Sequence, residues 1–194
     1  MKLPAFESAR KLVHVTGGLI PLVYLFFDLT KPQTLLILGG VAFPFVGVDI
    51  LRLSRPALNR WFLGWFHVSM RPGEETRVTG ATYYFLACWL TILLFERTVA
   101  AAALLILACG DTAASLVGQA IGGYRLRPGK TLSGTLAFLI AAFVVTLPFF
   151  PPVIALGAAF VGALTEFLPI PLDDNMTIPL SAGISLTLFH TLTA

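Results

Sequence analysis

The sequence predicts an all-α integral membrane protein with about seven transmembrane helices and a short interfacial helix between the second and third. Three observations predict this class: the composition, the number of long apolar runs, and the distribution of Lys and Arg. Hydrophobic residues make up 57% of the 194 residues, charged residues make up 12%, and the mean hydropathy is +0.86. An average soluble domain has about 25% charged residues, and disordered chains are poor in apolar residues. The composition therefore excludes both of those classes.

Seven apolar runs are long enough, or nearly so, for a helix of about 20 residues to cross the hydrocarbon core. They cover about residues 12–28, 33–51, 78–95, 98–121, 132–150, 152–168 and 176–193. The first run follows a basic segment, as in a signal peptide, but it has no small-residue cleavage pattern and six more runs come after it. We therefore expect it to be a span, and we expect one membrane-embedded domain over residues 1–194.

The segment between the second and third runs predicts an interfacial helix. Its aromatic residues, Trp61, Phe62, Trp65 and Phe66, interleave with arginines. Aromatic and basic side chains together are typical of a helix that lies in the headgroup region. We expect this helix to lie on the membrane surface and not to cross it.

The distribution of Lys and Arg predicts the orientation. Of the 13 basic residues, all but Lys31 and Arg97 fall in the N-terminal segment and the even-numbered loops, which lie on one predicted side. The positive-inside rule places that side in the cytoplasm. We expect a cytoplasmic N-terminus and an outside C-terminus. Because the basic residues sit in these loops, we expect no nucleic-acid partner.

Several ionisable groups lie in or at the ends of the apolar runs, where they are costly and usually functional. With the predicted orientation they all face the cytoplasmic leaflet. They are His14, Asp49, Asp111 and Glu166, and the loop before the last run adds Asp173, Asp174 and Asn175. Asp111, Ser115, Gly118 and Gly122 also share one helical face. The alternative for the two glycines alone is a helix-packing face.

The segment GGYRLRPGKTLSG predicts an anion site at the start of the fifth run. It is not a Walker A loop, which has four residues between its glycines, because Gly123 and Gly129 enclose five. Lys130, Thr131 and Ser133 nevertheless stand where backbone N–H groups of a helix N-terminus attract phosphate. The alternative is that the basic residues here only set topology.

Carboxylates close to these basic residues predict Mg²⁺ bridging a nucleotide phosphate, because Mg²⁺ prefers oxygen ligands. The candidate metal ligands are Asp111, Glu166, Asp173 and Asp174. The alternative for Asp174 or Asn175 is a helix N-cap.

Four stretches together resemble the polyprenol kinase family, which includes dolichol kinase, phytol kinase and CTP-dependent diacylglycerol kinase. In order they are ARKLVHVTGG, RVTGATYYFLA, CGDTAASLVGQAIGGYRLRPGKTLSGTLAF and ALTEFLPIPLDDNMTIPL. They extend from Ala9 to Leu180 and so cover nearly the whole chain. Ser133 departs from the family pattern, where many relatives have Glu, so we assign it no catalytic role.

The resemblance implies phosphoryl transfer from CTP to the hydroxyl of a membrane lipid, an isoprenoid alcohol or diacylglycerol, at the cytoplasmic interface. Such chemistry depends on positioning and charge neutralisation. Asp111, Glu166 and Asp174 are expected to hold Mg²⁺ or accept the hydroxyl proton. Basic and polar side chains are expected to bind or orient the phosphates and reacting groups. These are Lys130, Thr131, Arg10, Lys11 and Arg77, with His14 and Asn175 acting through hydrogen bonds.

Two other functions compete with this interpretation. A phosphatidate cytidylyltransferase also uses CTP, but its usual His-Gly-Gly and Asp-Arg ending is absent from the sequence. A small ion- or proton-coupled transporter would place its polar site near the midplane between repeats, whereas the polar groups here gather at one interface. The sequence leaves the lipid and the oligomeric state open, a homo-oligomer included.

Overall fold

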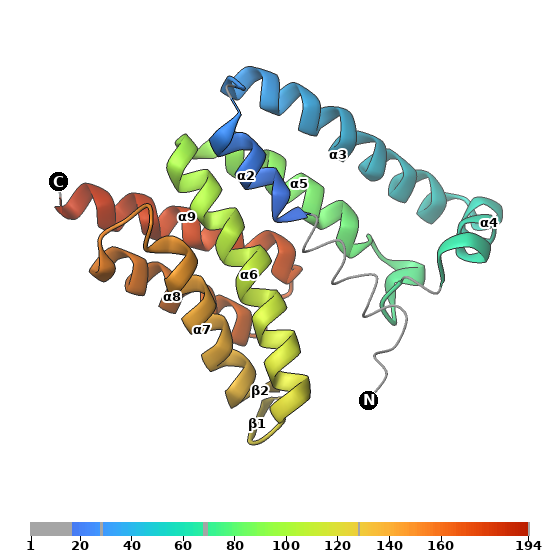
Figure 1. Cartoon of the computed structure of the whole chain (residues 1–194). Coiled ribbons are helices and arrows are strands. Elements are labelled where there is room, and N and C mark those ends of the chain that lie inside the picture. Colours follow the sequence, from blue (N-terminus) through green and yellow to red (C-terminus); the bar gives the residue numbers. More distant parts are fainter. Residues whose placement is uncertain (1–16, 28, 68–69, 128, 194) are drawn as a thin grey trace.

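The computed structural model describes residues 17–27, 29–67, 70–127 and 129–193 and is almost entirely helical (Figure 1). A short antiparallel pair of strands is the exception, and the sequence did not predict it. The elements are α2 (Leu19–Phe26), α3 (Lys31–Ser54), α4 (Pro56–Phe66), the 3-10 helix η2 (Glu74–Thr76), α5 (Gly80–Leu94), α6 (Arg97–Ile121), β1 (Arg125–Arg127), β2 (Lys130–Thr131), α7 (Leu132–Thr146), α8 (Pro152–Phe167) and α9 (Asp174–Thr193).

The helices begin where the sequence supplies capping groups. The Thr30 side chain accepts from the Gln33 backbone N–H, and the Gln33 side-chain oxygen accepts from the Thr30 backbone N–H. These two bonds make a capping box for α3. Thr79 and Thr131 cap α5 and α7 in the same way through the N–H three residues later. Proline opens α4 and α8, where no N–H is needed.

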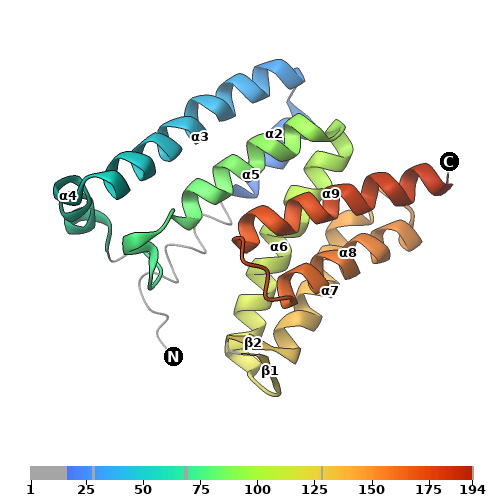
Figure 2. The same ribbon diagram turned by 180° about the vertical axis from the view of Figure 1, so that it is seen from behind.

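Helix α6 is the centre of the fold, since it packs against α2, α5, α7, α8 and α9 (Figures 1 and 2). Its run Ala100–Ala103 is fully buried. Small side chains let neighbouring helices approach closely. Helix α3 lies at the outside of the bundle, where it packs against α4 and α5.

Large apolar side chains face outward over much of the surface. Leu36 is 79% exposed, Val153 80% and Phe160 59%. Such surfaces are rare on monomeric soluble proteins, and they support a membrane protein. By length and composition α3 and α6 could cross a bilayer, and α5, α7 and α8 are shorter apolar helices of 15 or 16 residues. The all-α class is confirmed, while the arrangement of seven spans stays a prediction.

The polar residues gather at one end of the bundle, as expected for the groups that the structure describes. Lys130, in β2 just before α7, contacts Glu166 near the end of α8 and Asp174 at the start of α9. Asp49, near the end of α3, binds Thr79 at the start of α5. The ends of helices far apart in the sequence therefore build a shared polar region.

Candidate active site

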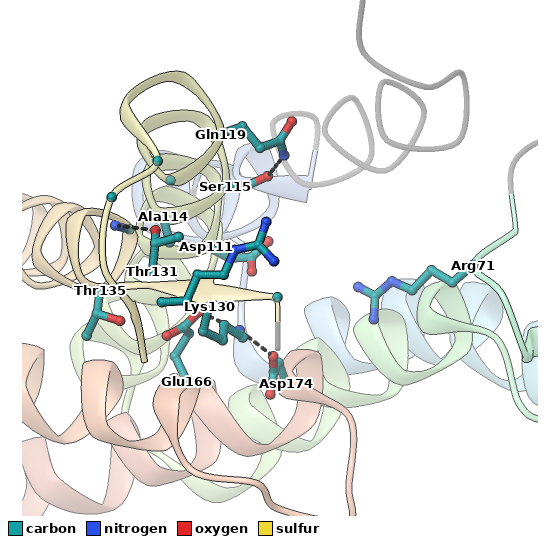
Figure 3. Close-up of a pocket in the computed structure, with 16 residues that line it drawn as sticks. Arg71, Asp111, Ala114, Ser115, Gln119, Lys130, Thr131, Thr135, Glu166 and Asp174 are labelled. Atoms are coloured by element: carbon teal, nitrogen blue, oxygen red, sulfur yellow. Dashed lines mark hydrogen bonds and ion pairs between the residues drawn. The ribbon is translucent and has the colours of Figure 1, made fainter. Parts of the chain in front are cut away.

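A cavity of about 780 Å³ opens at the polar end, among α6, the β1–β2 hairpin, α7 and the adjoining ends of α8 and α9 (Figure 3). It gathers five of the residues proposed from the sequence. These are Asp111, Lys130, Thr131, Glu166 and Asp174.

The small polar face of α6 forms one wall of this cavity. Asp111, Ser115, Gly118 and Gly122 all line it, as the helical spacing indicated. Gly118 also serves packing, because a Cβ there would lie 2.9 Å from Thr131 Oγ1 and 3.5 Å from the Cα of Gly134. The packing interpretation therefore holds for Gly118 and not for Gly122, where an added Cβ would meet nothing within 4 Å.

Glycine-rich backbone forms the rim. Gly122, Gly123 and Gly129 have φ values of +63°, +99° and +81°, which residues with a Cβ rarely adopt. All three line the cavity, and an added Cβ at each would meet nothing within 4 Å. Exposed backbone at a glycine turn, next to the N-terminus of α7, suits an anion that comes close to the main chain.

Lys130 is the best-anchored cation in the cavity. Its ammonium group donates to Glu166 Oε1 and, at 3.1 Å, to Asp174 Oδ2 (Figure 3). Burial opposes its charge, but the carboxylates of Asp174 and Glu166 outweigh burial and raise the pKa of Lys130 above its ordinary value. Lys130 therefore keeps its positive charge throughout the neutral and mildly alkaline range, where a nucleotide triphosphate is fully ionised.

One carboxylate oxygen in the cavity has capacity for a ligand. Glu166 Oε2 is buried and has no hydrogen-bond partner within the described part of the chain. Asp111 lines the same cavity and is only 9% exposed. Burying a carboxylate oxygen without a partner is costly, so the arrangement is suited to a cation that would complete it.

The four carboxylates expected to bind metal are not brought together. Within the described ranges, no group of three or more His, Cys, Asp or Glu side chains is placed to hold a metal ion. Asp173 instead pairs with Arg71 at 3.1 Å and does not line the cavity. Mg²⁺ commonly binds one or two carboxylates together with substrate phosphates and water, so Asp111 and Glu166 fit a metal that arrives with a nucleotide.

Arg71 lines the cavity, and the sequence interpretation missed it as a site residue. Arg71 reaches toward the cavity from the segment before α5, whereas the expected Arg77 is exposed and does not line it (Figure 3). Both residues lie in the same irregular segment, where no helical period fixes the direction of a side chain. Arg125 is a second lining cation that was not singled out.

Asn175 and Asp49 prove to be firmly held. Asn175 is 3% exposed, and its Nδ2 donates to the Gly80 carbonyl at 3.0 Å, which ties α9 to α5. Asp49 is 2% exposed and pairs with Arg52 at 2.5 Å. Neither residue lines the charged cavity. The expectations for Arg10, Lys11 and His14 lie outside the described residues.

Comparison with known proteins gives relatives over most of the chain. CTP-dependent diacylglycerol kinase 1 of Schizosaccharomyces pombe is 26% identical over 94% of this chain and 93% of its own. Probable phytol kinase 3 (chloroplastic) of Glycine max is 28% identical over 89% of this chain and 60% of its own. An uncharacterized protein of Methanocaldococcus jannaschii is 31% identical over 89% of this chain and 88% of its own.

Over most of its length the chain is similar to members of the polyprenol kinase-like family, at 26–28% identity. No family model matches the chain, and no solved structure matches it. The kinase relatives support lipid kinase activity in a membrane, with a nucleotide triphosphate and a lipid as substrates. They also support CTP as the co-substrate.

Proposed function

We propose that the protein transfers the terminal phosphoryl group of CTP to the hydroxyl of a membrane lipid alcohol. The acceptor class is an isoprenoid alcohol, such as phytol, polyprenol or dolichol, or diacylglycerol. The observation that carries the proposal is the charged cavity, in which Lys130 sits between Glu166 and Asp174 with Asp111 and Arg71 on the walls. The names of the kinase relatives support the nucleotide and the lipid.

In this proposal the cations and the backbone hold the triphosphate. Lys130, Arg71 and Arg125 neutralise its charge, and the N–H groups of Gly123, Gly129 and Thr131 donate to its oxygens. Phosphoryl transfer needs little more from a protein than positioning and charge neutralisation. Held this way, the γ-phosphorus lies in line with an attacking oxygen.

Asp111 and Glu166 would hold Mg²⁺ together with the nucleotide phosphates. The ion would supply further neutralisation of the phosphate oxygens. Asp174 is the carboxylate that we assign to accept the hydroxyl proton, because it lies on the α9 side of the cavity beside Asn175 and is 31% exposed at its side chain.

The proposed topology places seven spans in the membrane, with the cavity and the N-terminus in the cytoplasm and the C-terminus outside. Single cysteines near residues 125 and 172, in a chain without Cys88 and Cys109, should both react with an impermeant reagent from the cytoplasmic side only. Labelling from opposite sides would contradict a single cytoplasmic site.

The reaction itself is tested with CTP labelled at the γ- or the α-phosphate. Purified protein receives Mg²⁺, a set of lipid alcohols and phosphatidic acid. We expect lipid-soluble label from γ-labelled CTP only, with release of CDP. Transfer of α-label to phosphatidic acid would instead indicate a cytidylyltransferase. Absence of lipid label from CTP, ATP and GTP alike would leave the proposal without support and favour transport.

A further inference from the structure

A second cavity of about 480 Å³ lies beside the charged one, between α3, α4 and α5. Its volume is within the range of small-molecule sites. Most of its walls are apolar. The lining side chains from α3, α4 and the segment that follows α4 include Phe45, Val48, Trp61, Phe62, Phe66 and Met70.

The apolar part of this cavity is open to the outer surface of the bundle. Val48 is 46% exposed, Trp61 63% and Phe66 49%, and all three also line the cavity. Helix α4 carries the aromatic residues that predict an interfacial position. A chain that enters between α3 and α4 would therefore come from the lipid phase and not from water.

The other end of the cavity is polar and adjoins the charged cavity. Arg71 lines both cavities. Asn175 lines the apolar cavity, and its neighbour Asp174 lines the charged one. The two cavities thus meet at Arg71 and at the first turn of α9.

The polar groups at this junction are rigidly placed. Glu74 accepts from the backbone N–H groups of Arg71 and Gly80 at 2.9 Å each. Arg71 donates to Asp173 at 3.1 Å. With these bonds the junction has a fixed shape, which a reaction between a lipid end group and a nucleotide requires.

We propose that this apolar cavity binds the hydrocarbon chain of the lipid alcohol and presents its hydroxyl at the junction beside Asp174. The inference rests on the proposed function and adds the lipid site to it. The hydroxyl oxygen bonds to the γ-phosphorus while the bond from that phosphorus to the β–γ bridging oxygen breaks. CDP leaves, and the hydroxyl proton passes to Asp174.

A matched pair of variants on α3 tests the lipid site. Val48→Trp fills the cavity, while Ile50→Trp adds the same bulk at a position on the same helix that is 62% exposed and does not line the cavity. We expect Val48→Trp to raise the KM for a long-chain lipid alcohol about ten-fold, with the KM for CTP unchanged. Ile50→Trp should leave both constants near those of the wild type.

Photo-crosslinking gives a readout that needs no phosphoryl transfer. A phytol analogue with a diazirine near the chain end is irradiated with the full-length protein in nanodiscs without nucleotide. We expect label in residues 44–48 and 61–70 that excess phytol removes and that Val48→Trp, but not Ile50→Trp, abolishes. This crosslinking result would support the lipid site by itself. If no nucleotide gave a phosphorylated lipid in the separate activity assay, only the kinase chemistry would be rejected.

Two results would overturn the lipid site. One is lipid kinase activity in which the KM for the lipid is the same in Val48→Trp and Ile50→Trp, together with crosslinks that are confined to other surfaces. The other is a rise in the KM for CTP alone in Val48→Trp, which would make the aromatic cavity the site of the cytosine base.

Discussion

Two clusters of buried carboxylates and cations lie at the same end of this bundle, and they differ in how fully their groups are satisfied. In the first, Asp49 accepts from Arg52 Nε at 2.5 Å, from Thr79 N–H at 2.9 Å and from Thr82 Oγ1 at 2.6 Å. Arg52 also donates to Asn59 and to two backbone carbonyls. The side chains of Arg52 and Asp49 are 2% and 3% exposed.

The second cluster, Lys130 with Glu166 and Asp174, borders a cavity and is only partly closed. Lys130 is 20% exposed at its side chain and Asp174 31%, and one Glu166 oxygen has no partner among the residues described. A saturated buried pair holds segments together, whereas an incomplete one leaves capacity for a ligand. From this comparison we propose a structural role for Asp49 and a chemical role for the Lys130 cluster.

The largest expected effect is on activity, from Asp111→Asn. The change keeps the shape of the side chain but removes the charge that we assign to the metal and phosphates. We expect the rate of lipid phosphorylation to fall about 1,000-fold, while the melting temperature in detergent stays near that of the wild type. Near-normal turnover in Asp111→Asn would make this carboxylate structural and would leave the metal and phosphates without this ligand.

Asp49→Asn should have its effect on stability instead. The change leaves the Arg52 guanidinium buried without its counter-ion, which costs about 3–5 kcal/mol in comparable pairs. We expect a lower unfolding midpoint, with the kcat and the KM for CTP of the folded molecules retained. The KM for lipid does not separate the two roles, because Asp49 also lines the apolar cavity. If this variant yields no folded protein, Asn59→Ala removes one acceptor from Arg52 and should show a smaller loss of the same kind. Full stability with lost turnover in either variant would contradict a structural role.

Lys130→Gln sharpens the comparison at the nucleotide. Glutamine can still donate to Glu166 and Asp174 but has no charge for the phosphates. We expect kcat/KM for CTP to fall about 100-fold, with a smaller change in the KM for lipid, as measured by steady-state kinetics with each substrate varied. A larger change in the KM for lipid than in kcat/KM for CTP would contradict a role of Lys130 in binding the nucleotide phosphates.

The smallest expected effect separates two arginines in the same segment. Arg71→Ala should lower kcat/KM for CTP about ten-fold, because a charge-assisted contact of this kind contributes a few kcal/mol at most. Arg77→Ala, at an exposed position outside the cavity, should stay within about two-fold of the wild type. Equal losses in both variants would show that general positive charge, and not the direction of Arg71, matters here.

The sequence predicted the helices well because apolar runs and capping residues are local signals. The expected run 98–121 became α6 (Arg97–Ile121), and the expected interfacial segment contains α4 (Pro56–Phe66). The β1–β2 hairpin was missed because two strands of three and two residues carry no periodicity. Five of the expected site residues share a cavity because α6, β2, α8 and α9 each bring one or two of them to the same end of the bundle.

What the sequence could not predict depends on contacts between distant segments. Asp49 and Asp111 both appear as acidic residues in apolar runs, and only the structure shows that Asp49 accepts from Thr79 and Thr82 while Asp111 lines the charged cavity. Arg71 and not Arg77 lines the charged cavity, and this depends on the path of the irregular segment that holds both residues. The apolar cavity lies between three helices, and the segments that line it share no motif in the sequence.

The most direct test of the account measures the thermal shift that CTP and Mg²⁺ cause in the wild type, Lys130→Gln and Asp49→Asn. A ligand that binds only the folded state raises the melting temperature by mass action. We predict that Asp49→Asn keeps the CTP-induced rise and Lys130→Gln loses it, with each rise measured from the variant's own starting melting temperature, because both variants leave a buried charge without its counter-ion. A full CTP-induced rise in Lys130→Gln, or its loss in folded Asp49→Asn, would contradict the assignment of the two clusters.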